Sequence, residues 1–200
     1  MEPRKGAVAP RRVGILAVQG DIEAHARALD ACGAEPVRVL RKEHLDGLAA
    51  LVLPGGESTT IAKGIDRLGL ATPLRAFAHA GGAVLGTCAG AILLARRARN
   101  HPVQTLEVLD VEAERNAYGR QVDSFTALAD PGADPALAGF RCVFIRAPRL
   151  VAPGPSVEVL LRVDGDAVLV RSGTVLAATF HPELTDDPRI HALLLAHAGA

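Results

Sequence analysis

The 200-residue sequence has no excess of either charge and no apolar run long enough to cross a membrane. Its 22 Lys and Arg residues balance 22 Asp and Glu residues, so the charge predicts neither a nucleic-acid footprint nor binding to an anionic membrane. Every apolar run falls short of the ~20 residues that a spanning helix needs. Residues 1–12 contain Pro and Arg, and the apolar run Val13–Val18 stops at Gln19. We therefore expect no signal peptide and a flexible tail over residues 1–12.

Cysteine is also scarce. Cys32, Cys88 and Cys142 are odd in number, widely spaced and form no Cys-x-x-Cys pair. This pattern argues against a disulfide framework and against a zinc site, and it favours a reducing, cytoplasmic setting. The apolar fraction of 49% is ample for one core, and no repeat or low-complexity tract interrupts the chain. We predict one domain over residues 13–200 and no bound metal.

The first half of the chain alternates short apolar runs with segments of helical periodicity. Continuous apolar runs are typical of strands buried on both faces of a parallel sheet. The predicted order up to residue 95 is β-α-β-β-α-α-β-α, with a cap at Ser58 or Thr59 for one helix and Pro73 at the first position of the next. The predicted strands in this half are residues 13–18, 36–40, 51–53 and a run from 83.

After Arg99 short extended runs dominate, and they predict added antiparallel strands and hairpins. A last helix is predicted over Arg189–Ala198, with Asp187 as its N-cap and Pro188 at its first position, and Asp130–Gly139 is predicted as a loop rather than a linker. We therefore predict an α/β fold, a three-layer flavodoxin-like open mixed sheet flanked by helices, with antiparallel strands added in the C-terminal half. The predicted added strands are residues 106–112, 121–128, 140–145, 157–163, 167–171 and 175–180.

The most informative stretch is Gly86-Thr87-Cys88-Ala89-Gly90, between an apolar strand and an Ala/Leu-rich helical run. The two glycines flank the cysteine at the spacing of a nucleophile elbow, where a strained turn exposes the nucleophile. Cys88 would then lie at a helix N-terminus, which favours a thiolate. The alternative is an ordinary buried cysteine.

A catalytic cysteine needs a base and a group that orients it. His181 directly follows the strand Val175–Phe180, and Glu183 lies two residues on, so both side chains point the same way in extended backbone. This pair predicts a Cys-His-Glu triad, with solvated side chains at a turn as the alternative. The other histidines lie in helical or loop-like runs, where we expect solvated faces: His25, His44, His79, His101, His191 and His197.

Together these motifs resemble the class I, triad-type glutamine amidotransferase family. Within that family the chain is similar to the glutaminase subunits of pyridoxal 5′-phosphate synthases, and the similarity runs from about Val13 to the end. The stretches that carry the finer resemblance are Val18–Asp21, Leu53–Thr60, Glu114–Phe125, Phe144–Pro148 and Phe180–Thr185.

The resemblance implies a role for each matching position. Cys88 would attack the carboxamide carbon of glutamine to give a γ-glutamyl thioester, His181 would act as base and then acid, and Glu183 would orient it. The oxyanion hole would involve Gln19, Gly20 and Ala89, and the glutamine pocket would involve Gly56, Glu57, Ser58, Arg115, Ile145 and Arg146. The alternative role of Ser58 is that of a helix cap, and the alternative role of Gly56 is to allow the turn. Arg146 lies in an apolar strand, where burying an unpaired guanidinium would be costly, so a structural role alone explains it less well. We assign no catalytic role to Arg120 and Gln121 and expect them to be structural or to face the partner.

The resemblance also implies a partner. The ammonia would pass to a (β/α)₈-barrel synthase subunit within a large hetero-oligomer, and the glutaminase would stay weakly active until docking rearranges the Gln19-Gly20 turn. No cofactor is implied for this chain, because pyridoxal phosphate is the product of the complex. Two departures from the family pattern are Ala24-His25, where Glu-His is common, and Asn100–Leu109, which lacks a Gly-Leu-Leu pattern. The alternatives are a glutaminase for another acceptor, such as an imidazole glycerol phosphate synthase, a non-catalytic regulatory subunit and, less well supported, a cysteine protease.

Overall fold

The first half of the chain follows the predicted alternation of strands and helices. The computed structural model describes residues 10–100, 102–115 and 124–199. The order β-α-β-β-α-α-β-α is confirmed, with a short 3-10 helix η1 (Lys42–Leu45) before the third strand. The elements are β1 (Arg12–Leu16), α1 (Ile22–Ala31), β2 (Glu35–Val39), β3 (Ala50–Leu53), α2 (Ser58–Arg67), α3 (Ala71–His79), β4 (Ala83–Thr87) and α4 (Ala89–Leu94).

The main sheet has eight strands in the order β2-β1-β3-β4-β13-β12-β11-β8. Its first five strands are parallel, and β13 (Val175–Ala178) is the fifth of them, next to β4. This order is the 2-1-3-4-5 arrangement of flavodoxin-like folds. The last three strands are antiparallel additions at one edge, which confirms the predicted mixed sheet: β12 (Asp166–Ser172), β11 (Glu158–Val163) and β8 (Asp130–Pro131).

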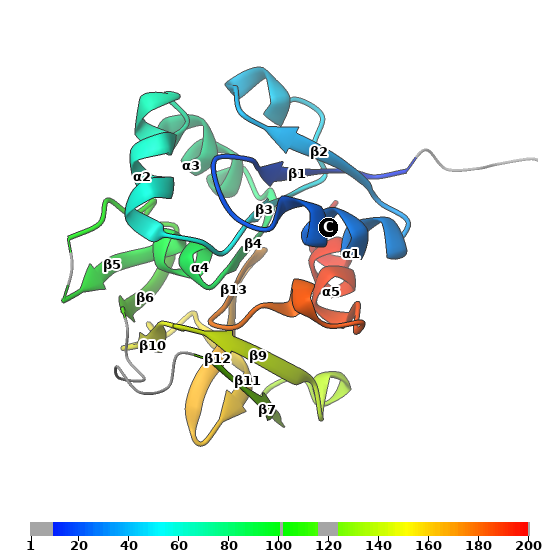
Figure 1. The fold of residues 1–200 in the computed structure, drawn as a ribbon, viewed down its shortest axis with the longest axis vertical. Coiled ribbons are helices and arrows are strands. Elements are labelled where there is room, and N and C mark those ends of the chain that lie inside the picture. The colour runs from blue at the N-terminus through cyan, green and yellow to red at the C-terminus, as the bar shows by residue number, and fades with distance from the viewer. Residues whose placement is uncertain (1–9, 101, 116–123, 200) are drawn as a thin grey trace, which may run out of the picture.

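Helices cover both faces of this sheet and make three layers (Figure 1). On one face lie α1 and α5 (Arg189–His197), and on the other lie α2, α3 and α4. The residues of β3 alternate between the two cores: Ala50 and Val52 pack with α1 and α5, while Leu51 and Leu53 pack with α2 and α3. Successive strand residues point to opposite faces, so a strand covered on both sides must be apolar throughout.

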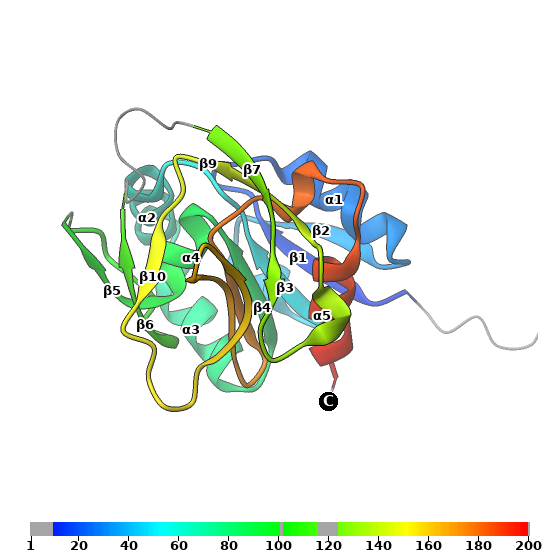
Figure 2. The same cartoon turned by 90° about the horizontal axis from the view of Figure 1, so that it is seen from below.

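The remaining strands form two small sheets. One pairs β7 (Ser124–Leu128) with β9 (Arg141–Ile145) and packs in the core of α1 and α5. The other has the order β10-β6-β5 and packs in the core of α4. Figure 2 shows β5, β6 and β10 together beside α2 and α4, with β7 and β9 side by side elsewhere. The bounds of the second sheet are β5 (Ala95–Arg99), β6 (Leu109–Glu114) and β10 (Arg149–Val151).

Several predicted boundaries were wrong. The helix after the elbow ends at Leu94, and the next five residues, for which no strand was predicted, form β5. Helix α3 begins at Ala71, so Pro73 is its third residue. The N-cap of α5 is Pro188 rather than Asp187, although an Asp187 carboxylate oxygen accepts a hydrogen bond from the N–H of Arg189 at 3.1 Å. The Asp130–Gly139 loop contains β8 and the 3-10 helix η2 (Pro135–Leu137).

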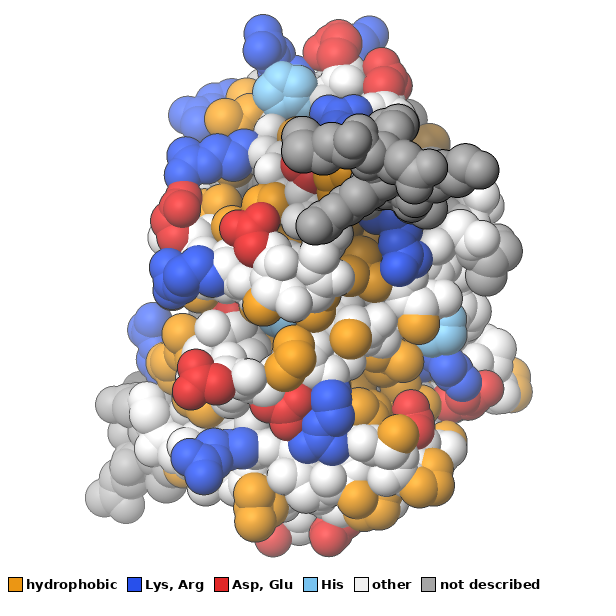
Figure 3. All heavy atoms as spheres, turned by 90° about the vertical axis from the view of Figure 1, so that its right-hand side faces the viewer, with side chains coloured by type: hydrophobic (Ala, Val, Ile, Leu, Met, Phe, Trp, Pro, Cys, Tyr) orange, Lys and Arg blue, Asp and Glu red, His pale blue; other side chains and the backbone are white. Residues whose placement is uncertain are grey.

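The predicted N-terminal tail lies mostly outside the described residues. Within them, Arg12 already belongs to β1, and the guanidinium of Arg11 donates to the carbonyl of Leu195 at 2.5 Å. None of the helices in the described ranges combines the length and apolarity required to cross a membrane. On the face that Figure 3 shows, basic and acidic side chains are interspersed, in keeping with the balanced composition.

Candidate active site

Cys88 lies in a strained turn between β4 and α4. Its backbone has φ 48° and ψ −104°, and its N–H donates to the carbonyl of Ala178 in the neighbouring strand at 2.8 Å. Such a conformation costs a non-glycine residue about 1–3 kcal/mol and persists only where the surroundings impose it. The predicted elbow is therefore present, at the carboxyl ends of two adjacent parallel strands.

The two glycines of the elbow are required by close packing. A Cβ added at Gly90 would overlap the carbonyl oxygen of Leu53, and one added at Gly86 would lie 2.7 Å from the backbone of Gly90. Only glycine lets α4 pass this closely over β3 and β4. The spacing of the glycines in the sequence thus reports a steric requirement of the fold.

His181 is placed by two different strands. It follows β13 after two residues, and its N–H donates to the carbonyl of Val143 in β9 at 2.8 Å. Glu183 lies in the 3-10 helix η3 (Pro182–Leu184), and its Oε1 is 2.7 Å from Nδ1 of His181. The expected contact is present, but a helical turn makes it, not the extended backbone that we predicted.

The electrostatics of this pair favour a charged imidazole. Burial disfavours the imidazolium, but hydrogen bonds to Cys88 and Glu183 outweigh burial and raise the pKa of His181 from 6.5 to about 10. Burial likewise disfavours the Glu183 carboxylate, yet the hydrogen bond from His181 and the nearby His25 hold the pKa of Glu183 below its usual value. Cys88, only 7% exposed, also places its Sγ 3.8 Å from the carbonyl of Ile145.

A cavity of about 150 Å³ opens onto Cys88 and His181. All six residues that the resemblance placed in the glutamine pocket line it, together with Ala89 and Ile92. The six are Gly56, Glu57, Ser58, Arg115, Ile145 and Arg146. The carboxyl ends of β3, β4, β9 and β13 therefore converge on one space, where open α/β sheets place their ligands.

Glu57, not Ser58 or Thr59, caps α2. Its carboxylate accepts hydrogen bonds from the N–H groups of Thr59 and Thr60 at 3.1 and 2.7 Å, and Arg115 Nη2 donates to its Oε1 at 3.2 Å. Burial opposes the charge, but the hydrogen bonds from Thr60 and Thr59 lower the pKa of Glu57 to about 2. Glu57 is thus a fixed negative charge at the cavity wall that also orients the Arg115 guanidinium.

Arg146 differs from the expectation. It follows the last residue of β9, has φ 44° and is exposed, so the argument from the cost of a buried guanidinium was wrong. Its strained backbone instead turns the chain beside the cavity, which it lines together with Ile145.

The Gln19-Gly20 turn lies behind residues that line the cavity and does not line the cavity itself. Gln19 Oε1 accepts a hydrogen bond from the N–H of Glu57 at 3.1 Å, and a Cβ on Gly20 would overlap the carbonyl oxygen of Gly55. Neither Gln19 nor Gly20 is among the described residues that line the cavity, whereas Ala89, the first residue of α4, is. Of the three predicted oxyanion positions, Ala89 therefore lines the cavity, while Gln19 and Gly20 lie against Glu57 and Gly55, and their role stays a prediction.

Sequence reasoning missed four residues behind the site. Gly55 lies against both catalytic candidates, because a Cβ there would overlap the His181 ring and lie 3.3 Å from Cys88 Cβ. Thr87 Oγ1 accepts from the N–H of Gly55 at 3.0 Å. His25 and His191, which we expected on solvated faces, are fully buried behind Glu183. The Pro-Gly-Gly run could have revealed Gly55, but no local signal marks the histidines. No group of three or more metal-ligating side chains occurs among residues 10–100, 102–115 and 124–199.

Comparisons with known proteins extend this description. Residues 15–198 match the SNO glutamine amidotransferase family. Over 187 residues the chain is 50% identical to a protein of Thermotoga neapolitana named pyridoxal 5′-phosphate synthase subunit PdxT, with 92% of this chain and 97% of the relative covered. A protein of the same name from Geobacillus kaustophilus is 49% identical over 180 residues, covering 90% of each chain.

A solved structure described as a glutamine amidotransferase superposes with a TM-score of 0.88 at 48% identity, covering 94% of this chain and 99% of that one. The match therefore covers nearly the whole chain. The family match over residues 15–198 and the identity of about one half place the chain plainly: it belongs to the SNO glutamine amidotransferase family.

Proposed function

We propose that this chain hydrolyses L-glutamine to L-glutamate and ammonia and delivers the ammonia to a pyridoxal 5′-phosphate synthase subunit. The observation that carries the proposal is the meeting of Cys88, His181 and Glu183 at two adjacent strand ends, open to a cavity of about 150 Å³. The relatives named as subunits of pyridoxal 5′-phosphate synthase support the identity of the pathway. The three cysteines, all free thiols, suit the reducing cytoplasm in which we expect it to act.

The first half-reaction forms a thioester. The Cys88 thiolate attacks the carboxamide carbon of glutamine, and the tetrahedral intermediate collapses as the imidazolium of His181 gives its Nε2 proton to the departing nitrogen. Ammonia leaves, the C–N bond is broken and a γ-glutamyl thioester remains on sulfur. The raised pKa of His181 suits this step, because the imidazolium then holds the proton that the departing nitrogen needs.

The second half-reaction reverses these roles. The neutral His181 takes a proton from water, the hydroxide attacks the thioester carbon, and collapse releases glutamate and restores the thiolate. Throughout both steps Glu183 holds the Nδ1–H of His181, so that Nε2 faces the sulfur.

Two charged side chains in the cavity wall would bind the charged groups of the glutamine substrate. Arg115 carries a planar fork that matches the α-carboxylate of glutamine, while Glu57, ionised because its pKa is near 2, suits the α-ammonium group. Ser58 and the backbone turns at Gly56 and Arg146 complete the cavity wall.

The oxyanion hole is proposed to form only in the complex. Ala89, at the N-terminus of α4, would supply one N–H, and the Gln19-Gly20 turn would supply another after it moves toward the cavity. In the described structure the N–H of Glu57 donates to Gln19 Oε1, and a movement of the turn would have to break this hydrogen bond. We propose that docking of a (β/α)₈-barrel synthase subunit, in a large hetero-oligomer, shifts this turn and raises glutaminase activity.

The test is ammonia release from glutamine, measured for the chain alone and with a pyridoxal 5′-phosphate synthase barrel subunit. We expect strong stimulation by that subunit, abolished in Cys88→Ala. Cys32→Ala is the matched control, because Cys32 is a partly exposed thiol at the C-cap of α1, and it should behave as the wild type.

Two outcomes would contradict the proposal. Glutamine hydrolysis that persists in Cys88→Ala would remove the proposed nucleophile. Stimulation by the barrel subunit of imidazole glycerol phosphate synthase, and not by the pyridoxal phosphate synthase subunit, would change the acceptor and leave the glutaminase chemistry in place.

A further inference from the structure

Two buried histidines lie directly behind Glu183, and the proposed catalytic cycle does not use them. His25 belongs to α1 and His191 to α5, and neither side chain has any exposed surface. The two helices lie side by side on one face of the sheet (Figure 1). Buried polar groups need hydrogen-bond partners, so the partners of this imidazole pair indicate its role.

The contacts form a chain that ends at the triad. His25 Nδ1 lies 3.0 Å from Nε2 of His191, and His25 Nε2 lies 3.5 Å from Oε2 of Glu183. Oε1, the other oxygen of that carboxylate, is 2.7 Å from Nδ1 of His181. The Glu183 side chain is 1% exposed, so its two oxygens face two imidazoles rather than water.

The protonation pattern follows from which groups are left unpaired. Within the described parts of the chain, neither His191 Nδ1 nor Glu183 Oε2 has a hydrogen-bond partner, so the 3.5 Å between His25 Nε2 and Oε2 is a close approach rather than a formed hydrogen bond. A buried bare acceptor is tolerated better than a buried orphan N–H, so the proton of His191 belongs on Nε2, where it donates to His25 Nδ1. His25 then carries its own proton on Nε2, which faces Glu183. The opposite pattern would leave an orphan N–H on His191 and set a lone pair of His25 against the carboxylate.

Burial keeps the imidazole pair neutral, as this pattern requires. Desolvation lowers the pKa of His25, against the opposing effect of Glu183, and desolvation together with His25 lowers the pKa of His191 to about 3. The other charged groups that act on His25 are His181, which lowers its pKa further, and Asp21 at the N-cap of α1, which raises it.

We propose that His25 is a positioning residue for the triad: its Nε2–H is directed at Oε2 of Glu183, and His191 fixes the tautomer that makes this possible. The role rests on the proposed function, in which Glu183 orients His181. His181 Nδ1 lies 2.7 Å from one oxygen, and an N–H of His25 directed at the other from 3.5 Å would hold the carboxylate toward His181 and oppose its uptake of a proton. His25 Nε2 also lies 3.3 Å from Oγ1 of Thr87, beside Cys88.

Three variants and a surface control separate positioning from mere packing. His25→Gln keeps an N–H donor near the place of Nε2, whereas His25→Leu removes it, and His191→Leu removes only the group that fixes the tautomer. His79, exposed at the end of α3, provides the control His79→Leu. The assay is ammonia release with the barrel subunit present, measured as kcat and KM from pH 5 to 9.

We expect His25→Leu to lose about 10- to 100-fold in kcat, the range implied by one hydrogen bond to a charged group, with KM little changed. The acidic limb of the pH–kcat profile of His25→Leu should move to higher pH, because Glu183 takes up a proton more readily in this variant. His25→Gln should recover most of the loss, His191→Leu should fall between them, and His79→Leu should match the wild type. Equal losses in His25→Gln and His25→Leu with an unmoved acidic limb would overturn the proposal.

A second measurement needs neither glutamine nor partner, so its failure is distinct from failure of the proposed function. The rate at which iodoacetamide alkylates Cys88, followed on the peptide that contains Cys88, reports how strongly His181 activates this cysteine. In His25→Leu this rate at neutral pH should fall, and in His25→Gln it should stay near the wild-type value. Nitrogen-15 NMR of the wild-type imidazoles gives a direct check that requires no variant. A neutral His25 protonated at Nε2 is expected, and protonation at Nδ1 would contradict the proposal.

Discussion

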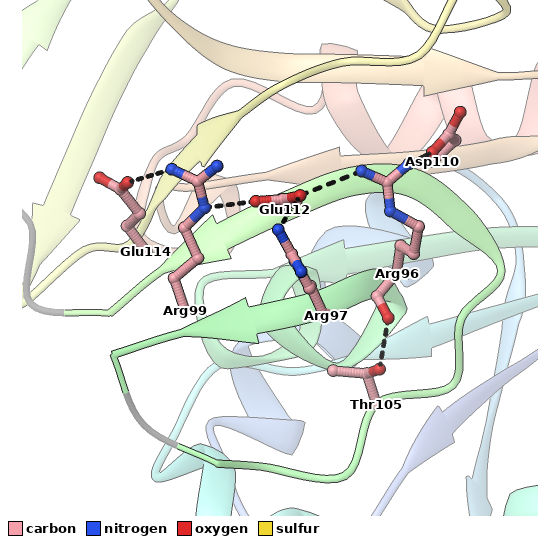
Figure 4. Close-up of polar contacts among 7 residues, drawn as sticks. All are labelled: Arg96, Arg97, Arg99, Thr105, Asp110, Glu112 and Glu114. Carbon is pink, nitrogen blue, oxygen red and sulfur yellow. Dashed lines mark hydrogen bonds and ion pairs between the residues drawn. The ribbon is translucent and has the colours of Figure 1, made fainter.

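Two glutamates are buried among the residues that the structure describes, and their carboxylates face different partners. The Glu183 side chain is 1% exposed and faces the imidazoles of His181 and His25, whereas the Glu112 side chain is 5% exposed and lies among arginines. Figure 4 shows Glu112 on β6 between the side chains of β5. Arg96 and Arg97 approach Oε1 at 3.1 and 2.7 Å, and Arg99 contacts Oε2.

The difference lies in whether the partners can change charge. Guanidinium groups stay protonated at every physiological pH, so Glu112 is held as a permanent carboxylate in a cross-strand network. Its pKa falls to about 2, because the hydrogen bonds from Arg99, Arg97 and Arg96 outweigh the effect of burial. Imidazoles can be charged or neutral, and those around Glu183 differ: the pKa of His181 is raised to about 10, whereas that of His191 is lowered to about 3. The arginine network links β5 to β6, whereas we propose that the imidazole network positions the catalytic groups.

Removing the charge from each glutamate should separate the two roles most strongly. Glu183→Gln is expected to lower kcat/KM on the order of 10³-fold, because the amide cannot hold His181 in the imidazolium form and the required tautomer. Glu112→Gln should leave kcat/KM within about twofold, since no reacting group contacts it, but should lower the melting temperature more than Glu183→Gln does. Paired kinetics and calorimetry of the two variants test this. A large loss of kcat/KM in Glu112→Gln together with a larger loss of melting temperature in Glu183→Gln would contradict the proposed difference between the two glutamates.

The next effect concerns the space between Cys88 and His181. Gly55→Ala introduces a methyl group that overlaps the His181 ring, so we expect a loss of about 10²-fold in kcat as the base moves by about 1 Å. Gly33→Ala is the matched control, because a Cβ there meets nothing within 4 Å although φ is +75°. It should cost about 1 kcal/mol of stability and leave kcat intact. A crystal structure of Gly55→Ala with His181 unmoved, together with full activity, would contradict this prediction.

The two networks should also respond to acid in different windows. The pKa of His191 falls from 6.5 to about 3 and that of His25 is also lowered, so the unfolded chain takes up these protons first as the pH falls below 6.5. Each such proton lowers the free energy of unfolding by about 1.4 kcal/mol per pH unit. Glu112 loses its contribution only between pH 4.5 and about 2, because its lowered pKa stabilises the fold above that window. Denaturant unfolding between pH 7 and 5 should therefore show a slope that His191→Leu reduces and Glu112→Gln leaves unchanged.

The smallest expected effect is the loss of stability on removing one arginine of the network around Glu112. The Arg97 side chain is 65% exposed, and Arg96 and Arg99 still contact Glu112 without it. Arg97→Ala should cost no more than about 1 kcal/mol, the usual limit for an exposed ion pair, and the cost should shrink in high salt. Chemical denaturation at low and high salt measures it, and a larger loss at high salt would be inconsistent with an ionic origin.

The parts of the fold that the sequence predicts well are those with a local cause. Strands such as β3 are buried on both faces, so a continuous apolar run marks them. The elbow at Cys88 is marked by the glycines whose Cβ atoms would collide with backbone. Such patterns are visible in single residues and their neighbours.

The parts that it misses depend on contacts between distant segments. β5 contains three arginines and resembles an exposed helix end until Glu112 is known to lie opposite them. His25 and His191 are 166 residues apart, and each alone suits a solvated helix face. Arg146 was expected to be buried because β9 is apolar, but the strand ends one residue before it. Burial of a polar side chain is decided by which elements pack together.

The most direct measurement is mass spectrometry of the chain quenched in acid while it turns over glutamine with the barrel subunit. We predict a γ-glutamyl adduct on the peptide that contains Cys88, absent in Cys88→Ala and accumulating in neither the Cys32 nor the Cys142 peptide. Normal ammonia release with no adduct on Cys88, or with an adduct on another residue, would contradict the account.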